Sequence, residues 1–161
     1  MIVVSNASPL ISLARTGQLD LLRRLYGEVL IPEAVWREVV VEGAGQAGAA
    51  EIGSASWIQK RAPADRALIC VLEQQLDAGE AEAVVLALET KAELLLMDER
   101  LGRLAAGRLG IRTTRLIGIL VESKHKGLIQ AVKPFLEALR DVAGFRIGED
   151  LLRRVLRDEG E

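Results

Sequence analysis

The opening stretch Ile2-Val3-Val4-Ser5-Asn6-Ala7-Ser8-Pro9-Leu10-Ile11 decides the fold, because an apolar run here meets a polar turn directly. The branched and apolar residues Ile2–Val4 favour a buried strand. Ser8 and Pro9 are typical of a helix N-cap and first helical residue, which predicts a helix over Leu10–Arg15. Asn6 therefore stands at the tip of a strand, where open α/β proteins bind their ligands.

The rest of the chain continues this alternation of strand-length apolar runs and amphipathic helical stretches. Strands are expected at Glu28–Ile31, Trp57–Gln59, Leu94–Met97 and Ile111–Thr113. Helices are expected at Leu19–Leu25, Pro32–Val39, Asp65–Gln75, Glu80–Thr90, Glu99–Arg108, Leu116–Lys126, Pro134–Asp141 and Asp150–Arg157, with a loose segment at Gly43–Ser54. Because strands that alternate with helices form right-handed crossovers, we predict an α/β fold with helices on both faces of the sheet. It is a single-domain doubly wound parallel sheet over residues 1–161, with a helical C-terminal third.

Composition excludes several classes of protein. Hydrophobic residues make up 50% of the 161 residues, which suits a packed core and excludes a disordered chain. No apolar run approaches the ~18 residues that a membrane span requires, so no membrane association is expected. The chain starts without a basic signal region, and its single cysteine, Cys70, has no partner for an intramolecular disulfide. We therefore expect a soluble, cytoplasmic protein.

The charge balance and the scarcity of histidine restrict the binding chemistry. The formal charge is -2, from 21 basic and 23 acidic residues, which argues against coating of nucleic acid by bulk charge. A local RNA-binding site is still compatible with this balance. His125 and Cys70 are the only residues of their types, so a zinc site of histidines and cysteines is excluded. Any metal ion is expected to be bound through oxygen atoms.

One glycine-rich motif carries less information than its pattern suggests. Gly43-Ala44-Gly45-Gln46-Ala47-Gly48 matches the dinucleotide-binding pattern G-x-G-x-x-G. That pattern requires a strand before it and a helix that opens from it. Here a helical stretch precedes the motif, and Ala49–Ser56 is short and interrupted by glycine and serine. The motif is interpreted as a flexible surface loop.

Several carboxylates stand where a parallel sheet would bring them together. Asp98 directly follows the expected strand Leu94–Met97, although a helix N-cap is an alternative role for it. Glu80 and Glu82 lie in the first turn of an apolar helix, where the helix dipole favours acidic residues. Dipole complementation explains one of these two glutamates, and the other needs a further reason.

Glu82 and Glu38 have apolar neighbours that set them apart from ordinary surface acids. Val85 and Leu86, one turn beyond Glu82, place its carboxylate beside the buried stripe of the helix. Glu38 is similarly surrounded, although a solvated helix position suits it equally well. A buried carboxylate requires a metal ion or a hydrogen-bonding partner. These acids are therefore candidates for a metal site.

Four blocks of the chain stand out together by their order and spacing: Asn6-Ala-Ser8-Pro-Leu-Ile, Pro32-Glu-Ala-Val-Trp-Arg-Glu38, Gly79-Glu80-Ala-Glu82-Ala-Val-Val-Leu-Ala and Leu95-Leu-Met-Asp98-Glu-Arg100. The series resembles the PIN domain. More narrowly, it is similar to the branch of PIN proteins that begin with an S-[DN]-A-S-P-L-I turn and include relatives of the VapC toxins. The resemblance covers nearly the whole chain.

The resemblance implies a function as well as a fold. It implies a metal-dependent ribonuclease, an endonuclease that cleaves single-stranded RNA in an acidic cleft with bound Mg²⁺ or Mn²⁺. It further implies a toxin paired with a small antitoxin protein, and a homodimer. By position, the four acids of the family correspond to the predicted catalytic residues Asn6, Glu38, Glu82 and Asp98, and Glu80 is an additional candidate.

The expected roles follow from this correspondence. Asp98 and Glu82 are expected to bind the metal, directly or through water, with Asn6 and Glu80 as further ligands. Glu38 is expected to orient a metal-bound water. Mg²⁺ suits such a site because it prefers hard oxygen ligands and keeps several waters.

Residues around this acidic centre have two alternative roles each. Ser8 matches the small hydroxyl residue that supports the first acid of the family, but it also suits the helix N-cap before Pro9. Substrate phosphates require a basic rim, for which the candidates are Arg100, Arg103, Lys124 and Lys126. Solvated surface charge is the alternative for each of these four.

Asn6 leaves two further classes of function open. An amide oxygen can bind a hard cation, but asparagine brings no charge to the position where the family often has aspartate. A non-catalytic interaction module with the PIN fold is therefore one alternative. A receiver-like signalling domain is another, although it would require an acid pair after the first strand, where this chain has Ser5 and Asn6.

Overall fold

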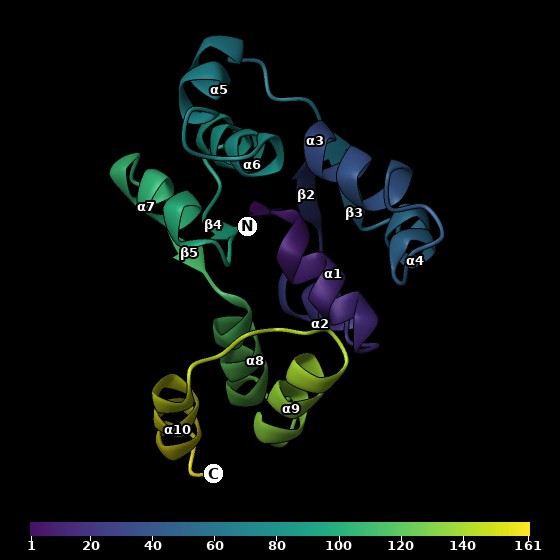
Figure 1. Ribbon diagram of the computed structural model, residues 1–161, viewed down its shortest axis with the longest axis vertical. Coiled ribbons are helices and arrows are strands. Elements are labelled where there is room, and N and C mark those ends of the chain that lie inside the picture. Colours follow the sequence, from purple (N-terminus) through teal and green to yellow (C-terminus); the bar gives the residue numbers. More distant parts are fainter.

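The computed structural model describes residues 1–161 and contains a five-stranded sheet in the order β3-β2-β1-β4-β5 (Figure 1). The strands are β1 (Val3–Ser5), β2 (Val29–Pro32), β3 (Ile58–Arg61), β4 (Leu94–Leu96) and β5 (Thr113–Thr114). All neighbouring strands are parallel, and β1 pairs with β2 on one side and β4 on the other. The predicted parallel α/β fold is confirmed.

Helices connect and cover these strands. The first half of the chain contains α1 (Ala7–Arg15), α2 (Asp20–Tyr26), α3 (Glu33–Trp36), a π-helical segment η1 (Arg37–Val41), α4 (Ala49–Ser54) and α5 (Arg66–Leu72). The second half contains α6 (Ala78–Glu89), α7 (Arg100–Arg108), α8 (Leu116–His125), α9 (Lys133–Asp141) and α10 (Glu149–Asp158). The last three helices lie together at one end of the molecule (Figure 1). None of the helices is long and apolar enough to cross a membrane.

Alternating side chains of the central strands build two hydrophobic cores, one on each face of the sheet. Val3 and Leu96 belong to a core of 23 buried residues formed with α1, α2, α3, α8 and α9. Val4 and Leu95 belong to a second core of 13 buried residues formed with α5, α6 and α7. This period of two explains why the strands are apolar on both faces and why helices cover both.

The segment predicted to be loose is partly helical, so this prediction is wrong for α4 (Ala49–Ser54). Ile52 is fully buried, and Ala49 is also buried, because α4 packs against α1 and η1. Gly48 precedes α4 with a φ of 91° and allows the chain to turn beside Ala14. Tertiary burial thus compensates for a local sequence that is rich in glycine. The π-helical segment η1, and not a strand, directly precedes the glycine motif, as expected from the sequence.

The N-terminal helix also begins earlier than predicted. Asn6 occupies the N-cap position with extended backbone angles, and α1 starts at Ala7 rather than after Ser8. Pro9 lies in the first turn, where a missing backbone N–H leaves no intrahelical hydrogen bond unmade. The prediction that Ser8 is the N-cap is therefore wrong, and its hydroxyl is free for another partner.

The strand order places a binding crevice between β1 and β4. The chain runs from β1 outward through β2 to β3 and then returns to the other side of β1 as β4. In open parallel sheets, ligands bind outside the carboxyl ends of the strands at such a reversal of strand order. Asn6 directly follows β1, and Asp98 and Glu99 follow β4, so the reversal brings these polar residues together.

Candidate active site

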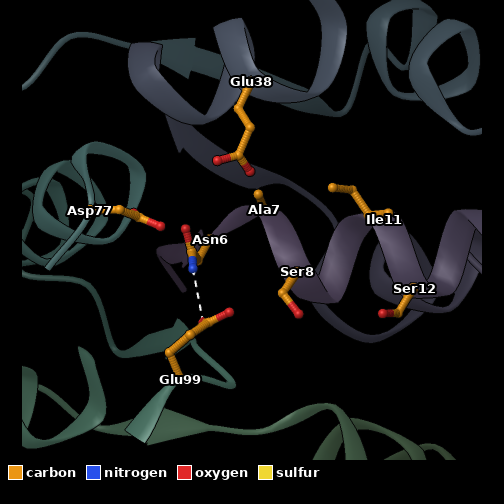
Figure 2. Close-up of a pocket in the computed structure, with 8 residues that line it drawn as sticks. All are labelled: Asn6, Ala7, Ser8, Ile11, Ser12, Glu38, Asp77 and Glu99. Carbon is orange, nitrogen blue, oxygen red and sulfur yellow. Dashed lines mark hydrogen bonds between the residues drawn. The ribbon is translucent and has the colours of Figure 1, made fainter. Parts of the chain in front are cut away.

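The crevice holds a cleft of about 220 Å³, here called the acidic cleft (Figure 2). Four elements contribute to it: the segment from β1 into α1, η1, the start of α6 and the start of α7. Its lining residues are Asn6, Ala7, Ser8, Ile11, Ser12, Glu38, Asp77 and Glu99. Three carboxylates from distant parts of the chain therefore face one cleft at the carboxyl edge of the sheet.

Asn6 anchors the floor of the acidic cleft. Its backbone N–H donates to the Leu96 carbonyl at 3.0 Å, which extends the pairing of β1 with β4 by one residue. Its side chain is 4% exposed, and Nδ2 donates to Glu99 Oε2 at 3.0 Å (Figure 2). The amide oxygen turns toward the side of the cleft where Asp77 and Glu38 lie (Figure 2). Asn6 thus offers a donor to one carboxylate and an oxygen to the open cleft.

Glu38 enters the acidic cleft from a π-helical turn. In η1 the backbone N–H of Glu42 donates to the Arg37 carbonyl, and this wider turn replaces a continuation of α3. Single π-helical turns are frequent at functional sites because they redirect side chains. Burial, together with the charges of Asp77, Glu42 and Glu99, raises the pKa of Glu38. The negative charges of Asp77 and Glu99 thus add to burial in disfavouring the ionised form of Glu38.

Asp77 and Glu80 form a capping box at the start of α6. Asp77 Oδ1 accepts from the Glu80 backbone N–H at 2.8 Å, and Glu80 Oε2 accepts from the Asp77 backbone N–H at 3.2 Å. Asp77 lines the acidic cleft, whereas Glu80 is not one of its lining residues. Burial, followed by the charge of Asp77, raises the pKa of Glu80 to about 6. Asp77 is not among the site residues predicted from the sequence, although the spacing D-x-x-E before an apolar run is a signal for this cap.

Glu99, and not its neighbour Asp98, lines the acidic cleft after β4. Glu99 occupies the N-cap position of α7 in an extended conformation without capping that helix through its side chain. Its carboxylate instead accepts the hydrogen bond from Asn6. The sequence analysis selected the first acid after the strand and so did not include Glu99 among the site residues.

Asp98 lies beside the acidic cleft and joins three elements. Its Oδ1 accepts from the Leu116 backbone N–H at 2.8 Å, at the first residue of α8, and its Oδ2 accepts from Ser8 Oγ at 3.2 Å. Burial raises the pKa of Asp98, although these hydrogen bonds oppose the rise. Asp98 caps α8 rather than the helix that directly follows it. It reaches the cleft through Ser8, whose hydroxyl supports this acid.

Glu82, like Asp98 and Glu80, is a predicted acid that does not line the acidic cleft. It is 7% exposed, and its Oε1 accepts from the Ala34 backbone N–H at 3.1 Å. Its Oε2 pairs with the Arg66 guanidinium at 3.2 Å. The carboxylate therefore has partners within the protein, and it holds the start of α3 against α6.

The donor set of the acidic cleft matches a hard divalent cation. Glu38, Asp77 and Glu99 supply carboxylate oxygens, and Asn6 supplies an amide oxygen. No group of three His, Cys, Asp or Glu side chains converges closely enough to enclose a metal ion. Mg²⁺ usually binds through one or two carboxylates and retains water in its other positions, so a closed cage is not required. The residues fit Mg²⁺ or Mn²⁺ as oxygen ligands around an open position.

The basic residues that the sequence analysis considered for a phosphate rim have different surroundings. Lys124 pairs with Glu161 and Glu159, and Lys126 pairs with Glu122, all away from the acidic cleft. Arg100 is exposed at the start of α7. Arg103 lines a second cleft, described below.

Comparison with known proteins agrees with this fold. The chain matches the family described as "DUF3368: PIN domain" over residues 2–161. It belongs to the PIN domain family. PIN domains form a superfamily of nuclease folds, and the resemblance inferred from the four sequence blocks is confirmed at this level. The narrower branch with the S-[DN]-A-S-P-L-I opening and the relationship to VapC toxins stay predictions.

A solved structure supports the fold of this PIN domain independently. The chain is similar to a PilT N-terminus domain protein from the hyperthermophilic archaeon Sulfolobus solfataricus P2, with a TM-score of 0.54 and 19% identity. The similarity covers 76% of this chain and 93% of that protein. No match was found among curated proteins.

Proposed function

We propose that this PIN domain protein is a metal-dependent endonuclease for single-stranded RNA and that the acidic cleft is its active site. The observation that carries the proposal is the meeting of Glu38, Asp77 and Glu99 with the Asn6 amide at the reversal of strand order. The raised pKa of Glu38 agrees with a site in which acids repel one another until a cation is bound.

The side chains of the cleft suggest a division of roles. Asp77, Glu99 and the Asn6 amide oxygen would hold Mg²⁺ or Mn²⁺, and Asn6 Nδ2 orients the Glu99 carboxylate. When bound, the metal supplies charge neutralisation for the phosphate and lowers the pKa of water. Glu38, with its raised pKa, is placed to orient the attacking water and accept its proton. The oxygen of this water would form a bond to phosphorus while the bond between phosphorus and the leaving oxygen breaks. The proton that Glu38 accepts from the water is then returned through solvent to the leaving oxygen.

The roles predicted for the remaining acids change in this proposal. Asp98 becomes a positioning residue that holds Ser8 at the wall of the cleft and caps α8. Glu82 becomes a structural acid of α6. Glu80 supports Asp77 through the capping box, with no direct place in the cleft.

The biological setting is proposed from the family resemblance. We propose a cytoplasmic toxin that acts on RNA and is neutralised by a small antitoxin protein, and that functions as a homodimer. Pairing with an antitoxin can be tested separately from the catalytic activity. Co-purification with a small protein expressed from a neighbouring gene would test this pairing.

Cleavage of a labelled, unstructured RNA in Mn²⁺ tests the catalytic proposal. The parent is expected to cleave internally in Mn²⁺ and to be inactive in chelator. Asp77→Asn and Glu99→Gln should each abolish cleavage, whereas Glu82→Gln, a change of one buried acid outside the cleft, should retain it. Cleavage that survives both cleft substitutions but fails in Glu82→Gln would show that the active site has been placed wrongly.

A non-catalytic interaction module is the second candidate, and Asn6 is the observation that favours it. The neutral Asn6 amide donates a hydrogen bond to the Glu99 carboxylate, so Glu99 has a partner without any cation. A parent protein that shows neither RNA cleavage nor any stabilisation by Mn²⁺ would support this candidate.

A further inference from the structure

A second cleft of about 380 Å³ lies between α7, β5 and α8, and α10 contributes one wall. We call it the arginine cleft. Its principal lining residues are Arg103, Thr113, Thr114, Arg115, Gly118 and Leu151. We propose that this cleft binds a phosphate of the RNA strand next to the one that is cleaved, with Arg103 and Arg115 as its ligands. The proposal rests on the proposed nuclease function.

The two guanidinium groups of the arginine cleft lie near the Asp98 carboxylate but do not form a salt bridge with it. Neither Arg103 nor Arg115 forms a salt bridge, and Arg103 donates only to the backbone carbonyl of Asp98. An anion bound in the arginine cleft would supply the charge partner that neither side chain has as a salt bridge.

The polar groups of the arginine cleft suit a phosphate. Arginine presents a planar fork of donors that matches phosphate oxygens, and hydroxyl groups supply further donors. The Thr114 side chain lies so close to α8 that a Cβ at Gly118 would be 2.4 Å from Thr114 Oγ1. Glycine at this position therefore leaves room for the threonine hydroxyl at the wall of the cleft.

The arginine cleft adjoins the acidic cleft through Asp98. The Asp98 carboxylate binds Ser8, which lines the acidic cleft, while its backbone carbonyl binds Arg103, which lines the arginine cleft. Glu99 and Arg103 belong to adjacent turns of one helix, since the Arg103 N–H donates to the Glu99 carbonyl. A strand whose scissile phosphate lies at the acids can thus place a neighbouring phosphate at the arginines.

Substitution of Arg115 is the most direct test, because this side chain is exposed and makes no hydrogen bond within the protein. Binding of a fluorescent, unstructured RNA is measured in chelator, so that cleavage does not interfere. Arg115→Gln should weaken binding about tenfold at low salt, in line with the loss of a charge-assisted hydrogen bond. The slope of log affinity against log salt should fall by about 0.7, the contribution of one phosphate contact on a single strand.

Two further variants control for charge and for folding. Arg24→Gln removes the same charge from the exposed surface of α2, away from both clefts, and should keep the parental slope. Arg115→Lys keeps the charge and should also retain the slope, with an affinity between those of the parent and Arg115→Gln. Melting temperatures should be equal in all variants, which confirms that the comparison concerns binding.

The outcomes separate this proposal from the nuclease function. If Arg115→Gln binds RNA as Arg24→Gln does, while the parent cleaves RNA in Mn²⁺, the phosphate site is refuted and the nuclease function stands. If the parent neither binds nor cleaves RNA, the nuclease function fails, and the phosphate site fails with it. If Arg115→Lys loses the salt slope as Arg115→Gln does, a charge contact to phosphate is also excluded.

Discussion

Asn6 both extends the pairing of β1 with β4 through its backbone and binds an acid of the acidic cleft through its side chain. Its Nδ2 donates to Glu99 at 3.0 Å, so the amide stabilises an acid that a carboxylate at the same position would repel. The consequence is that Glu99 has a hydrogen-bonding partner without metal, while the cleft has one negative charge fewer for binding a cation.

Asn6→Asp should exchange stability in the metal-free state for metal affinity. The side chain is nearly isosteric, but it replaces the hydrogen bond to Glu99 by repulsion between two carboxylates. In chelator the variant should melt below the parent, and Mn²⁺ should raise its melting temperature by more. RNA cleavage should rise with metal affinity. A variant that binds Mn²⁺ no better than the parent would mean that Asn6 is only a strand-end turn residue.

The titration of Glu80 predicts a dependence of stability on pH. Its pKa in the folded protein is about 6, above its ordinary value of 4.5, so the folded state binds a proton more tightly than the unfolded state. In chelator, the free energy of unfolding should therefore fall as pH rises from 4.5 to 6, and the melting temperature should fall with it. Glu80→Gln, which keeps a capping side chain, should flatten this part of the profile. An unchanged profile would assign the effect to Glu38 or Asp98, whose pKa values are also raised.

At the scale of elements, α6 holds two acids with opposite surroundings. Asp77 at its N-cap faces the acidic cleft, while Glu82, on its next turn, lies against α3. Helical geometry separates them, because residues five apart point in different directions around the helix axis. The same helix thus contributes one acid to the acidic cleft and another to the packing of α6 against α3.

Substitutions of Glu82 should act on stability and leave the metal site intact. Glu82→Ala leaves the buried Ala34 N–H without its acceptor, which should lower the free energy of unfolding by about 1–3 kcal/mol. Glu82→Gln keeps an acceptor oxygen, so its loss should be clearly smaller. Urea denaturation measures both effects, and Mn²⁺ titration of the Gln variant should match the parent. Loss of Mn²⁺ binding in Glu82→Gln would instead return Glu82 to the metal site.

At the scale of the whole molecule, the acidic cleft joins both halves of the chain. Asn6 and Glu38 come from the first half, and Glu99 follows β4 on the other side of β1. A cation bound between them exists only in the folded state, because the unfolded chain separates these residues. Metal binding should therefore stabilise the fold as a whole.

Thermal melts in Mn²⁺ and in chelator measure this coupling. A metal present at a hundredfold excess over its dissociation constant should stabilise the protein by about 2.7 kcal/mol. Glu99→Gln should lose most of the stabilisation, whereas Arg24→Gln should keep it. Equal stabilisation of the parent and Glu99→Gln would place the cation outside the acidic cleft.

The sequence was sufficient for most of the elements, with α4 as the exception, and for the strand ends that border the proposed site. Apolar runs such as Leu94–Met97 indicate buried strands, and Asn6 and Asp98 mark the ends of β1 and β4. These inferences depend on periodicity and on turn residues, which act within a few positions along the chain. The four blocks also sufficed to identify the PIN family.

Only the tertiary structure decided which acid faces the cleft. Asp98 and Glu99 are adjacent, but Asp98 accepts a hydrogen bond from the N-terminus of α8, whereas Glu99 accepts one from Asn6. Glu82 likewise accepts a hydrogen bond from the start of α3, and Asp77 at the N-cap of α6 lines the acidic cleft instead. The physical reason is that each buried carboxylate binds the donors nearest to it in space. Those donors belong to elements distant in the sequence, so packing of the complete fold assigns the roles.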